Sequence, residues 1–238
     1  NGRSSYLLAN ENATDTAVEA IRALRTNIYF SMLDAKNNVL MITGAAPEAG
    51  KSFISSNLAT VMAQSGKKVL LIDADMRKGY LEQLFSTHVA PGLSELLSGE
   101  ASPVEAVQQT DIENLFFISH GNYTQSSSEL LMNKRLGDLI EQASKRYDYV
   151  IIDTPPVLAV TDAAIVGQHV GMTLMVARYG YTTAQDLDNA ARRLVQSNIN
   201  IKGVILNGIK RDAFNSYNCY SYGSYTAGSD KKAAKSKG

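Results

Sequence analysis

The stretch "NVLMITGAAPEAGKSFISSNLATVMAQSG", residues 38–66, joins an apolar run, a short loop and a segment with helical spacing of apolar residues. The run "NVLMITG" predicts a buried strand, and "KSFISSNLATVMAQSG" predicts an amphipathic helix closed by Gly66. The loop fits the relaxed phosphate-binding pattern (A/G)xxxxGK(S/T) from Ala45 to Ser52, whereas the strict pattern has glycine at Ala45. A strand, such a loop and a helix predict an anion site formed by backbone N–H groups at the helix N-terminus.

The loop residues have separate predicted tasks in nucleotide binding. Gly50 lets the backbone approach a phosphate, Lys51 can reach the β- and γ-phosphates, and the Ser52 hydroxyl can ligate Mg²⁺. The predicted nucleotide-binding residues of this loop are Ala46, Pro47, Glu48, Ala49, Gly50, Lys51, Ser52 and Phe53. ATP and Mg²⁺ are therefore the expected cofactors. The alternative, a flexible turn with an exposed lysine, does not account for the flanking strand and helix.

Apolar runs and helical segments alternate along the rest of the chain. Strands are predicted over residues 67–73, 114–119, 147–153, 171–178 and 201–208, and helices over 15–33, 127–147, 161–170 and 183–198. Thr14 or Asp15 is the expected N-cap of the first of these helices, and Ser127 or Ser128 that of the second. The strands are continuous apolar runs, which indicates a mostly parallel sheet covered by helices on both faces. We therefore expect an α/β fold of the P-loop NTPase type, with ligands bound beyond the C-terminal ends of the strands.

Acidic residues follow two of the predicted strands. "LLIDADMR" places Asp73 and Asp75 at the end of one strand, and "VIIDTPP" places Asp153 at the end of another. An acid in this position is the usual outer ligand of Mg²⁺ in P-loop enzymes, and phosphoryl transfer also needs a group that orients the attacking oxygen. Asp75 alone fits a helix cap equally well. Together with the loop, these acids predict a magnesium site with a spare carboxylate.

The composition narrows the class of protein. The chain has 238 residues, 45% of them hydrophobic and 19% charged, which suits one sizeable α/β domain or two small ones. Its net charge is zero, so composition does not indicate nucleic-acid binding. The single Cys219 excludes a disulfide framework within the chain and fits a reduced compartment. The longest apolar region, 149–177, is interrupted by Asp153 and Asp162 and cannot be a transmembrane helix. The chain begins with Asn1, so we expect a fragment of a longer protein.

The C-terminal segment concentrates tyrosine. The stretch "NSYNCYSYGSY", residues 215–225, holds Tyr217, Tyr220, Tyr222 and Tyr225, and no Leu, Ile, Val, Met or Phe occurs from Asn215 onward. Such a segment buries too little apolar surface to offset the entropy of ordering it. We expect available hydroxyls on a flexible arm; the alternative is a tyrosine-rich linker with no regulatory role.

Taken together, these features resemble the bacterial tyrosine kinases (BY-kinases), the Wzc-like proteins of capsule and exopolysaccharide export. The family pattern is a Walker A loop, a Walker A′ motif of hydrophobic residues followed by DxD, a Walker B strand and a tyrosine cluster. These occur in order here as "GAAPEAGKS", "LLIDADMR", "VIIDTPP" and the tail. An early helix carries "EAIRALR", in which Glu19, Arg22 and Arg25 match the family's ExxRxxR motif. The resemblance covers about residues 11–225.

The resemblance implies a MinD/ParA-like P-loop fold and transfer of the ATP γ-phosphate to tyrosine hydroxyls. By position it implies catalytic roles for Lys51 and Asp73, with Asp73 as the candidate base. The implied magnesium ligands are Ser52, Asp75 and Asp153, and the implied phosphorylation sites are Tyr80, Tyr217, Tyr220, Tyr222 and Tyr225. Tyr80 matches an internal regulatory tyrosine, although a packing tyrosine beside the cleft is the alternative. Asn207 matches an asparagine that reads adenine in related ATPases, or marks a plain strand-end turn.

The resemblance also implies an assembly and a setting. Glu19, Arg22 and Arg25 would hold a homo-oligomeric ring; the alternative is a solvated face with local ion pairs. Expected partners are the tails of neighbouring subunits, a cognate tyrosine phosphatase and the polysaccharide export machinery, with no nucleic acid. The expected organisation is a flexible segment over 1–14, a kinase domain over 15–212 and a flexible tyrosine-rich tail over 213–238. The chain would be the cytoplasmic domain of a bacterial inner-membrane protein.

Two departures from the family pattern stand out. The segment "NYTQSSSELL" keeps only "SELL" of a proline-rich family sequence, and His120 stands where relatives have an arginine that pairs with the phosphorylated internal tyrosine. An imidazole is a weaker phosphate partner than a guanidinium, which puts the Tyr80 switch in doubt.

Two other functions compete with the kinase. A MinD/ParA-like partitioning ATPase would carry an extra lysine five positions before Lys51, where this chain has Ala46. A nucleotide-gated assembly scaffold would share the ATP site and the oligomer helix with a kinase. Transfer of labelled phosphate to tyrosine separates these alternatives.

Overall fold

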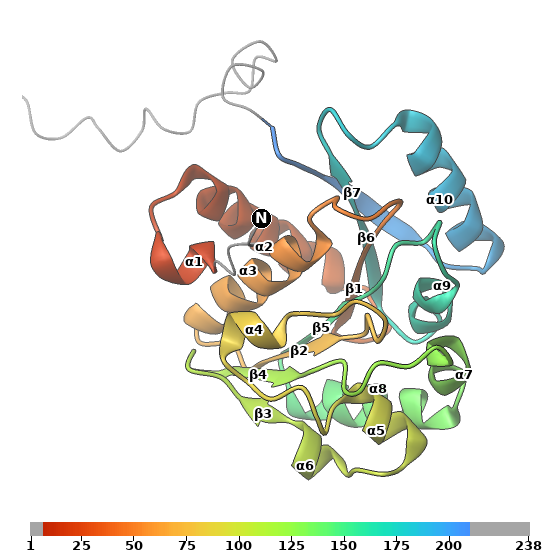
Figure 1. The fold of residues 1–238 in the computed structure, drawn as a ribbon. Coiled ribbons are helices and arrows are strands. Elements are labelled where there is room, and N and C mark those ends of the chain that lie inside the picture. Colours follow the sequence, from red (N-terminus) through yellow and green to blue (C-terminus); the bar gives the residue numbers. More distant parts are fainter. Residues whose placement is uncertain (1–6, 210–238) are drawn as a thin grey trace, which may run out of the picture. The chain divides into compact units, whose positions relative to one another are not determined.

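Figure 1 shows the computed structural model, which describes residues 7–209. The chain is divided into two compact units, Asn1–Asn207 and Gly208–Gly238. The helices and strands all belong to the first unit. The tail tyrosines Tyr217, Tyr220, Tyr222 and Tyr225 lie outside the described residues, so their phosphorylation remains a prediction.

A seven-stranded sheet forms the centre of the fold, in the order β3-β4-β2-β5-β1-β6-β7. Its strands are β1 Val39–Gly44, β2 Val69–Asp73, β3 Gln108–Gln109, β4 Leu115–Ile118, β5 Tyr149–Asp153, β6 Met172–Arg178 and β7 Ile201–Asn207. All neighbours run parallel except β3 and β4. Every residue of β1 and β2 is buried, as expected for strands covered on both faces. The predicted mostly parallel α/β sheet is confirmed.

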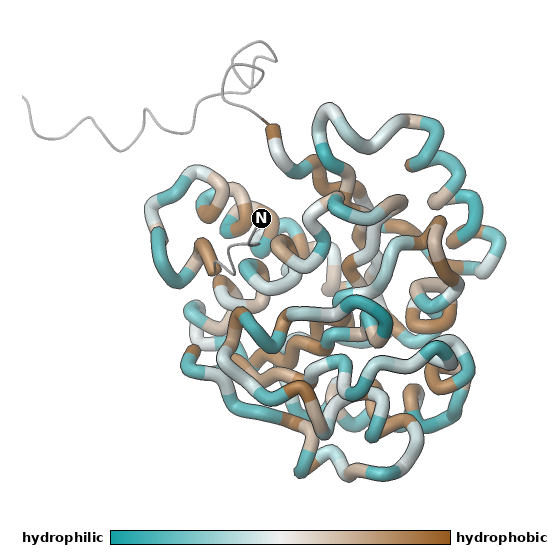
Figure 2. The backbone as a smooth tube through the Cα atoms, viewed as in Figure 1, coloured by the Kyte–Doolittle hydropathy of each residue, from teal (hydrophilic) through white to brown (hydrophobic). Residues whose placement is uncertain are grey.

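Helices cover both faces of the sheet (Figure 1). One face carries α1 Leu8–Glu11, α2 Thr16–Met32, α3 Lys51–Gln64 and α4 Glu82–Phe85. The other carries α5 Leu93–Ser98, α6 Pro103–Ala106, α7 Ser127–Leu131, α8 Lys134–Arg146, α9 Asp162–Gly167 and α10 Ala184–Gln196. Each face has its own apolar core. Figure 2 shows apolar segments along the centre of the sheet and mixed polarity on outer helices such as α10.

The helix predicted over 127–147 is two helices in the structure. α7 ends at Leu131 and α8 begins at Lys134, with Asn133 in extended conformation between them. The Asn133 side chain accepts a hydrogen bond from the Arg135 N–H at 3.1 Å, so it caps α8. The serines expected to cap the single helix make no side-chain cap at the start of α7. Their hydroxyls have another partner, which is described below.

From Leu7 on, the N-terminal segment packs onto the fold, in contrast to the flexible stretch expected over 1–14. Leu7 and Ala9 are buried in the core of the α3 face. The Ala9 N–H donates to Asn57 Oδ1 at 2.8 Å, which ties α1 to α3. The apolar side chains of an otherwise polar segment are thus buried against α3, a helix distant in sequence. Asp15 accepts a hydrogen bond from the Ala17 N–H at 2.8 Å, so its predicted role as N-cap of α2 is confirmed.

Within residues 7–209, none of the helices combines the length and the apolar composition that a bilayer-spanning segment needs.

Candidate active site

The three predicted motifs meet at the C-terminal ends of adjacent strands. Asp73, the last residue of β2, pairs in register with Asp153, the last residue of β5. On the other side of β5 lies β1, which leads into the phosphate loop, residues 44–52. Because parallel strands end at one edge of the sheet, the loop and both carboxylates are brought together there.

The phosphate loop requires glycine at position 50. Gly50 has φ +91°, and a Cβ built on it would lie 2.0 Å from Asn207 Nδ2. The same amide nitrogen donates a hydrogen bond to the Ala49 carbonyl at 3.1 Å. Asn207 thus braces the loop from the end of β7. This contact places Asn207 beside the predicted nucleotide site, and its predicted role in reading adenine stays a prediction.

Lys51 is buried, which does not fit the alternative of a flexible turn with an exposed lysine. Its relative exposure is 8%, and a Cβ built on Gly44 would lie 3.3 Å from its Cδ. The aliphatic stem therefore packs over the end of β1.

Both carboxylate oxygens of Asp153 are paired with hydroxyl groups of α3. Its Oδ2 accepts the Ser52 hydroxyl at 2.7 Å, and its Oδ1 accepts the Ser55 hydroxyl at 2.7 Å. Burial raises its pKa to about 6, and Lys51 and the two hydroxyls limit the rise. Ser55 was missed in the sequence, although its i+3 spacing from Ser52 puts both hydroxyls on one face of α3. We call the phosphate loop, Ser55 and Asp153 the nucleotide side of the site.

Asp73 is buried and closed off by backbone. Its carboxylate accepts hydrogen bonds from the Asp75 N–H at 3.0 Å and the Leu81 N–H at 3.3 Å. Burial, followed by the nearby charge of Asp153, raises its pKa well above the usual range. A carboxylate with a raised pKa is a stronger proton acceptor, as the predicted role of base requires.

Asp75 is partly exposed, and its side chain is hydrogen-bonded to the backbone of the loop that follows it. Its Oδ1 accepts the Lys78 N–H at 2.9 Å and the Arg77 N–H at 3.3 Å. Together with Ser52 and Asp153 it offers a hydroxyl and two carboxylates, the hard oxygen donors that Mg²⁺ prefers. Across residues 7–209, no three His, Cys, Asp or Glu side chains are arranged as a metal cluster. The donor set therefore suits a magnesium ion that also binds phosphate oxygens and water, rather than an all-protein cage.

A buried carboxylate, Asp162, joins three segments around the site and was missed in the sequence. It accepts the hydroxyls of Ser127 at 2.8 Å and Ser128 at 2.5 Å, which explains why these serines do not cap α7. The Arg77 Nε lies 3.7 Å from Asp162 Oδ2. Asp162 thus links the loop after β2, the start of α7 and the start of α9. No periodic pattern marks such a contact, because its partners are far apart in sequence.

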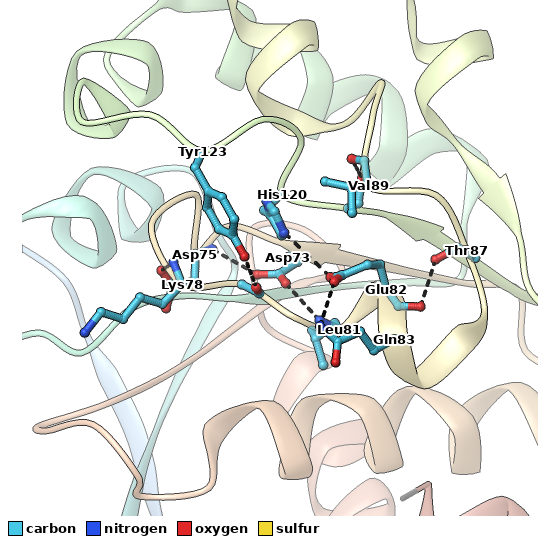
Figure 3. A network of polar contacts seen from close by, with 12 residues as sticks. Asp73, Asp75, Lys78, Leu81, Glu82, Gln83, Thr87, Val89, His120 and Tyr123 are labelled. Carbon is cyan, nitrogen blue, oxygen red and sulfur yellow. Dashed lines mark hydrogen bonds and ion pairs between the residues drawn. The ribbon is translucent and has the colours of Figure 1, made fainter. Parts of the chain in front are cut away.

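A second group of residues, Gly79, Glu82, His120 and Tyr123, lies beside Asp73, and we call it the acceptor side. Figure 3 shows Glu82, His120 and Tyr123 around Asp73. The Tyr123 hydroxyl donates to the Gly79 carbonyl at 3.0 Å, and its ring stacks on His120 at 4.6 Å. His120 is fully buried, and its Nε2 lies 3.6 Å from Glu82 Oε2. Within residues 7–209, the two nitrogens of His120 have no hydrogen-bond partner, and Glu82 Oε2 has none either.

The predicted regulatory residues have distinct places in this arrangement. Tyr80 is half-buried next to Gly79 in the loop after β2. His120 lies beneath Tyr123 and against Gly79, where a Cβ would be 2.5 Å from His120 Cδ2. The imidazole expected to pair with a phosphorylated Tyr80 is therefore covered in this state. The Tyr80 switch stays a prediction.

The predicted oligomer residues make contacts within their own chain. Arg22 pairs with Glu19 and also donates to the Ala13 carbonyl at 3.0 Å. Arg25 reaches back to α3, where its NH1 donates to the Val61 carbonyl at 3.4 Å. The i, i+3, i+6 spacing thus does not keep all three side chains on an outward face. Their predicted contact between subunits stays a prediction.

Comparisons with known proteins identify the family. A family model described as AAA domain matches residues 38–202. The chain is 51% identical over 230 residues, 97% of its length, to tyrosine-protein kinase wzc of Salmonella typhimurium, of which it spans 32%. It is also 49% identical over 210 residues, 88% of its length, to tyrosine-protein kinase etk of Escherichia coli, of which it spans 29%. The chain therefore covers about a third of the length of these curated relatives.

Solved structures agree with the sequence relatives. The kinase domain of Escherichia coli tyrosine kinase ETK matches with a TM-score of 0.85 at 48% identity, over 94% of this chain and 86% of that one. The septum site-determining protein MinD of Pyrococcus horikoshii, complexed with Mg-ADP, matches with a TM-score of 0.62 at 22% identity, over 71% of this chain and 69% of that one. The MinD likeness shows a shared fold, as predicted. The chain belongs to the family of bacterial tyrosine-kinase domains.

Proposed function

We propose that this chain transfers the γ-phosphoryl group of ATP to tyrosine hydroxyls of neighbouring copies, with Tyr217, Tyr220, Tyr222 and Tyr225 as the main acceptors. The observation that carries the proposal is the pair of buried carboxylates at adjacent strand ends. Asp153 is held by the phosphate-loop hydroxyl of Ser52, and Asp73 beside it has a pKa well above the usual range. Relatives named tyrosine-protein kinases support the acceptor type.

The residues present fit a magnesium nucleotide. Gly50 leaves no room for a side chain at the start of α3, where backbone N–H groups suit phosphate. Ser52, Asp75 and Asp153 supply oxygen donors for the metal, and a MinD relative in complex with Mg-ADP shares the fold. When bound, Mg-ATP supplies the phosphoryl group and a divalent charge that neutralises its oxygens.

The chain's own residues then have separate tasks. Lys51 contributes positive charge at the developing phosphate oxygens, and the phosphate loop holds them in place. Asp73 accepts the phenol proton of the acceptor tyrosine, for which its raised pKa suits it. Because Asp73 is buried, an acceptor reaches it only after the segment over it, residues 78–81, moves.

The proposal extends to assembly and setting. We infer a homo-oligomer, built as a ring in which Glu19, Arg22 and Arg25 contribute to contacts between subunits. A tethered tail gives a high effective concentration of tyrosine at a neighbouring site, so weak affinity for each tyrosine is sufficient. A tyrosine phosphatase that resets the tail and the polysaccharide export machinery are the proposed partners. The proposed setting is the cytoplasmic part of an inner-membrane protein that regulates capsule or exopolysaccharide export.

A mixing experiment tests the proposal. The acceptor is the full chain with Lys51→Met, and the donor is an active full chain whose four tail tyrosines are changed to Phe. With labelled Mg-ATP, we expect phosphotyrosine on the tail of the Lys51→Met chain only when the donor is present. Hydrolysis of ATP without any phosphotyrosine would contradict the kinase proposal and favour a MinD/ParA-like ATPase. No turnover of ATP at all would favour a nucleotide-gated scaffold.

A further inference from the structure

We propose that Tyr123 is itself a phosphorylation site, and that its modification releases residues 78–81 from above Asp73. The inference rests on the proposed kinase function. It concerns a tyrosine that lies in none of the sequence motifs, on the loop between β4 and α7 (Figure 3).

Tyr123 combines an accessible side chain with a specific contact at the site. It is 63% exposed, yet its hydroxyl donates to the Gly79 carbonyl at 3.0 Å. Its ring covers His120, with the two rings nearly parallel at an interplanar angle of 16°. A surface tyrosine without a role would not need both contacts on the acceptor side.

The contact with Gly79 holds the segment that closes off the candidate base. Two residues after Gly79, the Leu81 N–H donates to Asp73 Oδ2. Gly79 itself lies so close that a Cβ on it would be 2.6 Å from Asp73 Oδ2 and 2.5 Å from His120 Cδ2. Tyr123 and His120 therefore both contact Gly79, within the segment 78–81 that covers Asp73.

Phosphorylation would break this contact in two ways. A phosphate ester on the Tyr123 oxygen has no hydrogen to donate, so the bond to the Gly79 carbonyl is lost. The modification also adds a charge of about −1.5 to −2 next to acidic groups. Glu82, Asp73 and Asp75 are near enough to add to the effect of burial in raising the pKa of Tyr123. The modified side chain would be repelled from this position, toward solvent and the exposed Lys78.

The movement does not require the loop to unfold. The residues on both sides of Tyr123 are anchored: the Asn122 N–H and amide donate to Glu95 Oε1, and the Thr124 N–H donates to the Met76 carbonyl. Only the side chain must rotate, which exposed side chains do within nanoseconds. The hydroxyl is thus presented to another copy of the chain from a fixed backbone.

The transfer balances as in the proposed reaction. The bond between the γ-phosphorus and the β,γ-bridging oxygen of ATP breaks, and a bond forms from phosphorus to the Tyr123 oxygen. The phenol proton passes to the Asp73 carboxylate of the modifying copy, and ADP leaves.

Peptide mapping provides the first test. Full-length chain is incubated with Mg-ATP until the tail is fully phosphorylated, then cut after glutamate. Residues 114–129 then form a peptide with Tyr123 as its one tyrosine, residues 49–82 contain Tyr80, and residues 20–48 contain Tyr29. Tyr29 is 51% exposed and serves as the control for exposure alone. We expect phosphate on 114–129 and none on 20–48.

The outcomes separate this inference from the proposed function. Phosphate on the tail but not on 114–129 overturns the inference and leaves the kinase proposal standing. Equal labelling of 114–129 and 20–48 also overturns it, because exposure would then explain the modification. Absence of phosphotyrosine everywhere overturns both proposals.

Kinetics provide the second test, in a Tyr80→Phe chain so that the predicted Tyr80 switch does not contribute. The net effect of one hydrogen bond corresponds to a change of about fivefold in the population of the open segment. We expect phosphorylation to raise kcat toward an added tyrosine peptide by about this factor. Tyr123→Phe, which lacks the donor to the Gly79 carbonyl, should show the raised kcat before phosphorylation and no further increase after it. The same increase on phosphorylation of the Tyr123→Phe chain would overturn the release step.

Discussion

The nucleotide side and the acceptor side of the site meet at Asp73, which pairs with Asp153 and lies against Gly79, yet their buried polar groups differ in how many have hydrogen-bond partners. On the nucleotide side, both oxygens of Asp153 accept hydroxyl hydrogen bonds at 2.7 Å. On the acceptor side, both nitrogens of His120 and one oxygen of Glu82 have no hydrogen-bond partner within residues 7–209. Buried polar groups normally have partners, so each exception calls for an explanation.

The difference indicates which side is built to move. A fully paired network resists displacement, because any movement leaves a charged group without its hydrogen bonds. A side with unpartnered groups loses less when it opens, since water can then reach them. The nucleotide side would therefore stay fixed during phosphoryl transfer, whereas residues 78–81 would open to admit the acceptor tyrosine.

The largest expected effect on phosphoryl transfer comes from removing the charge of Lys51 on the nucleotide side. Lys51→Met keeps the aliphatic stem that packs over Gly44 but removes the ammonium group. We expect phosphoryl transfer to fall by on the order of 10²–10³-fold or more, because the charge acts on the transition state. The change in Tm should stay within about 3 °C, since the packing is kept.

Lys67→Met is the matched control, because Lys67 precedes β2 at the opposite edge of the sheet and is exposed. Its activity should equal that of the parent in a labelled-phosphate assay. Comparable activity of Lys51→Met and Lys67→Met would break the assignment of the nucleotide side.

The next effect is a dependence of stability on pH. Burial raises the pKa of Asp153 to about 6 in the folded chain, against an ordinary value near 3.8. Between these values the folded state holds a proton that the unfolded state has lost, so stability falls as pH rises from about 4 to about 6. A shift of about two units corresponds to about 3 kcal/mol. Asp73, whose pKa is also raised, acts in the same direction.

Unfolding of the chain and of Asp153→Asn in the presence of a chelator, from pH 4 to pH 7, measures this effect. Burial, followed by the charge of Lys36, lowers the pKa of His169, so His169 makes stability rise with pH. Because both chains contain His169, its contribution cancels in the comparison. Asp153→Asn should lose less stability over this range while losing activity. Identical pH profiles for the two chains would show that burial does not perturb Asp153.

Asp162 provides an intermediate effect, because it links the loop after β2 to α7 and α9. Asp162→Asn weakens two hydrogen bonds to a buried charge, from Ser127 and Ser128, and the pairing with Arg77. We expect the free energy of unfolding in urea to fall by about 1–3 kcal/mol. Asp188→Asn, which affects only an exposed pair with Arg192, should cause no measurable change. Equal midpoints for both variants would show that Asp162 is not a structural link.

The two sides also differ in how far the sequence predicted them. The phosphate loop, Asp73, Asp75 and Asp153 follow apolar runs, and parallel strands bring such positions to one edge. For these residues, the local pattern of an apolar run followed by polar residues was sufficient to predict their place at the site. Ser55 was within reach of the same reasoning, because helical spacing aligns it with Ser52.

The acceptor side could not be predicted in this way. Tyr123 contacts Gly79 across 44 residues of sequence, and Ser127 contacts Asp162 across 35. No periodicity links such partners. The break between α7 and α8 was missed for a related reason: Ser127 and Ser128 look like caps of one long helix, but their hydroxyls serve a distant carboxylate. A flexible segment was expected over 1–14 because the sequence does not show that Leu7 and Ala9 are buried against α3.

The smallest expected effects test the comparison directly, with one substitution on each side. Ser55→Ala removes a hydrogen bond to the buried Asp153 and should lower the free energy of unfolding by about 1–2 kcal/mol. Glu82→Gln removes a buried charge that lacks a partner on one oxygen and adds an amide able to donate toward His120. It should raise the free energy of unfolding by about 0.5–1 kcal/mol, since a buried carboxylate oxygen without a hydrogen bond is costly. Urea unfolding at pH 7.5 measures both, and a loss of stability in both variants would show that the two sides are equally well satisfied.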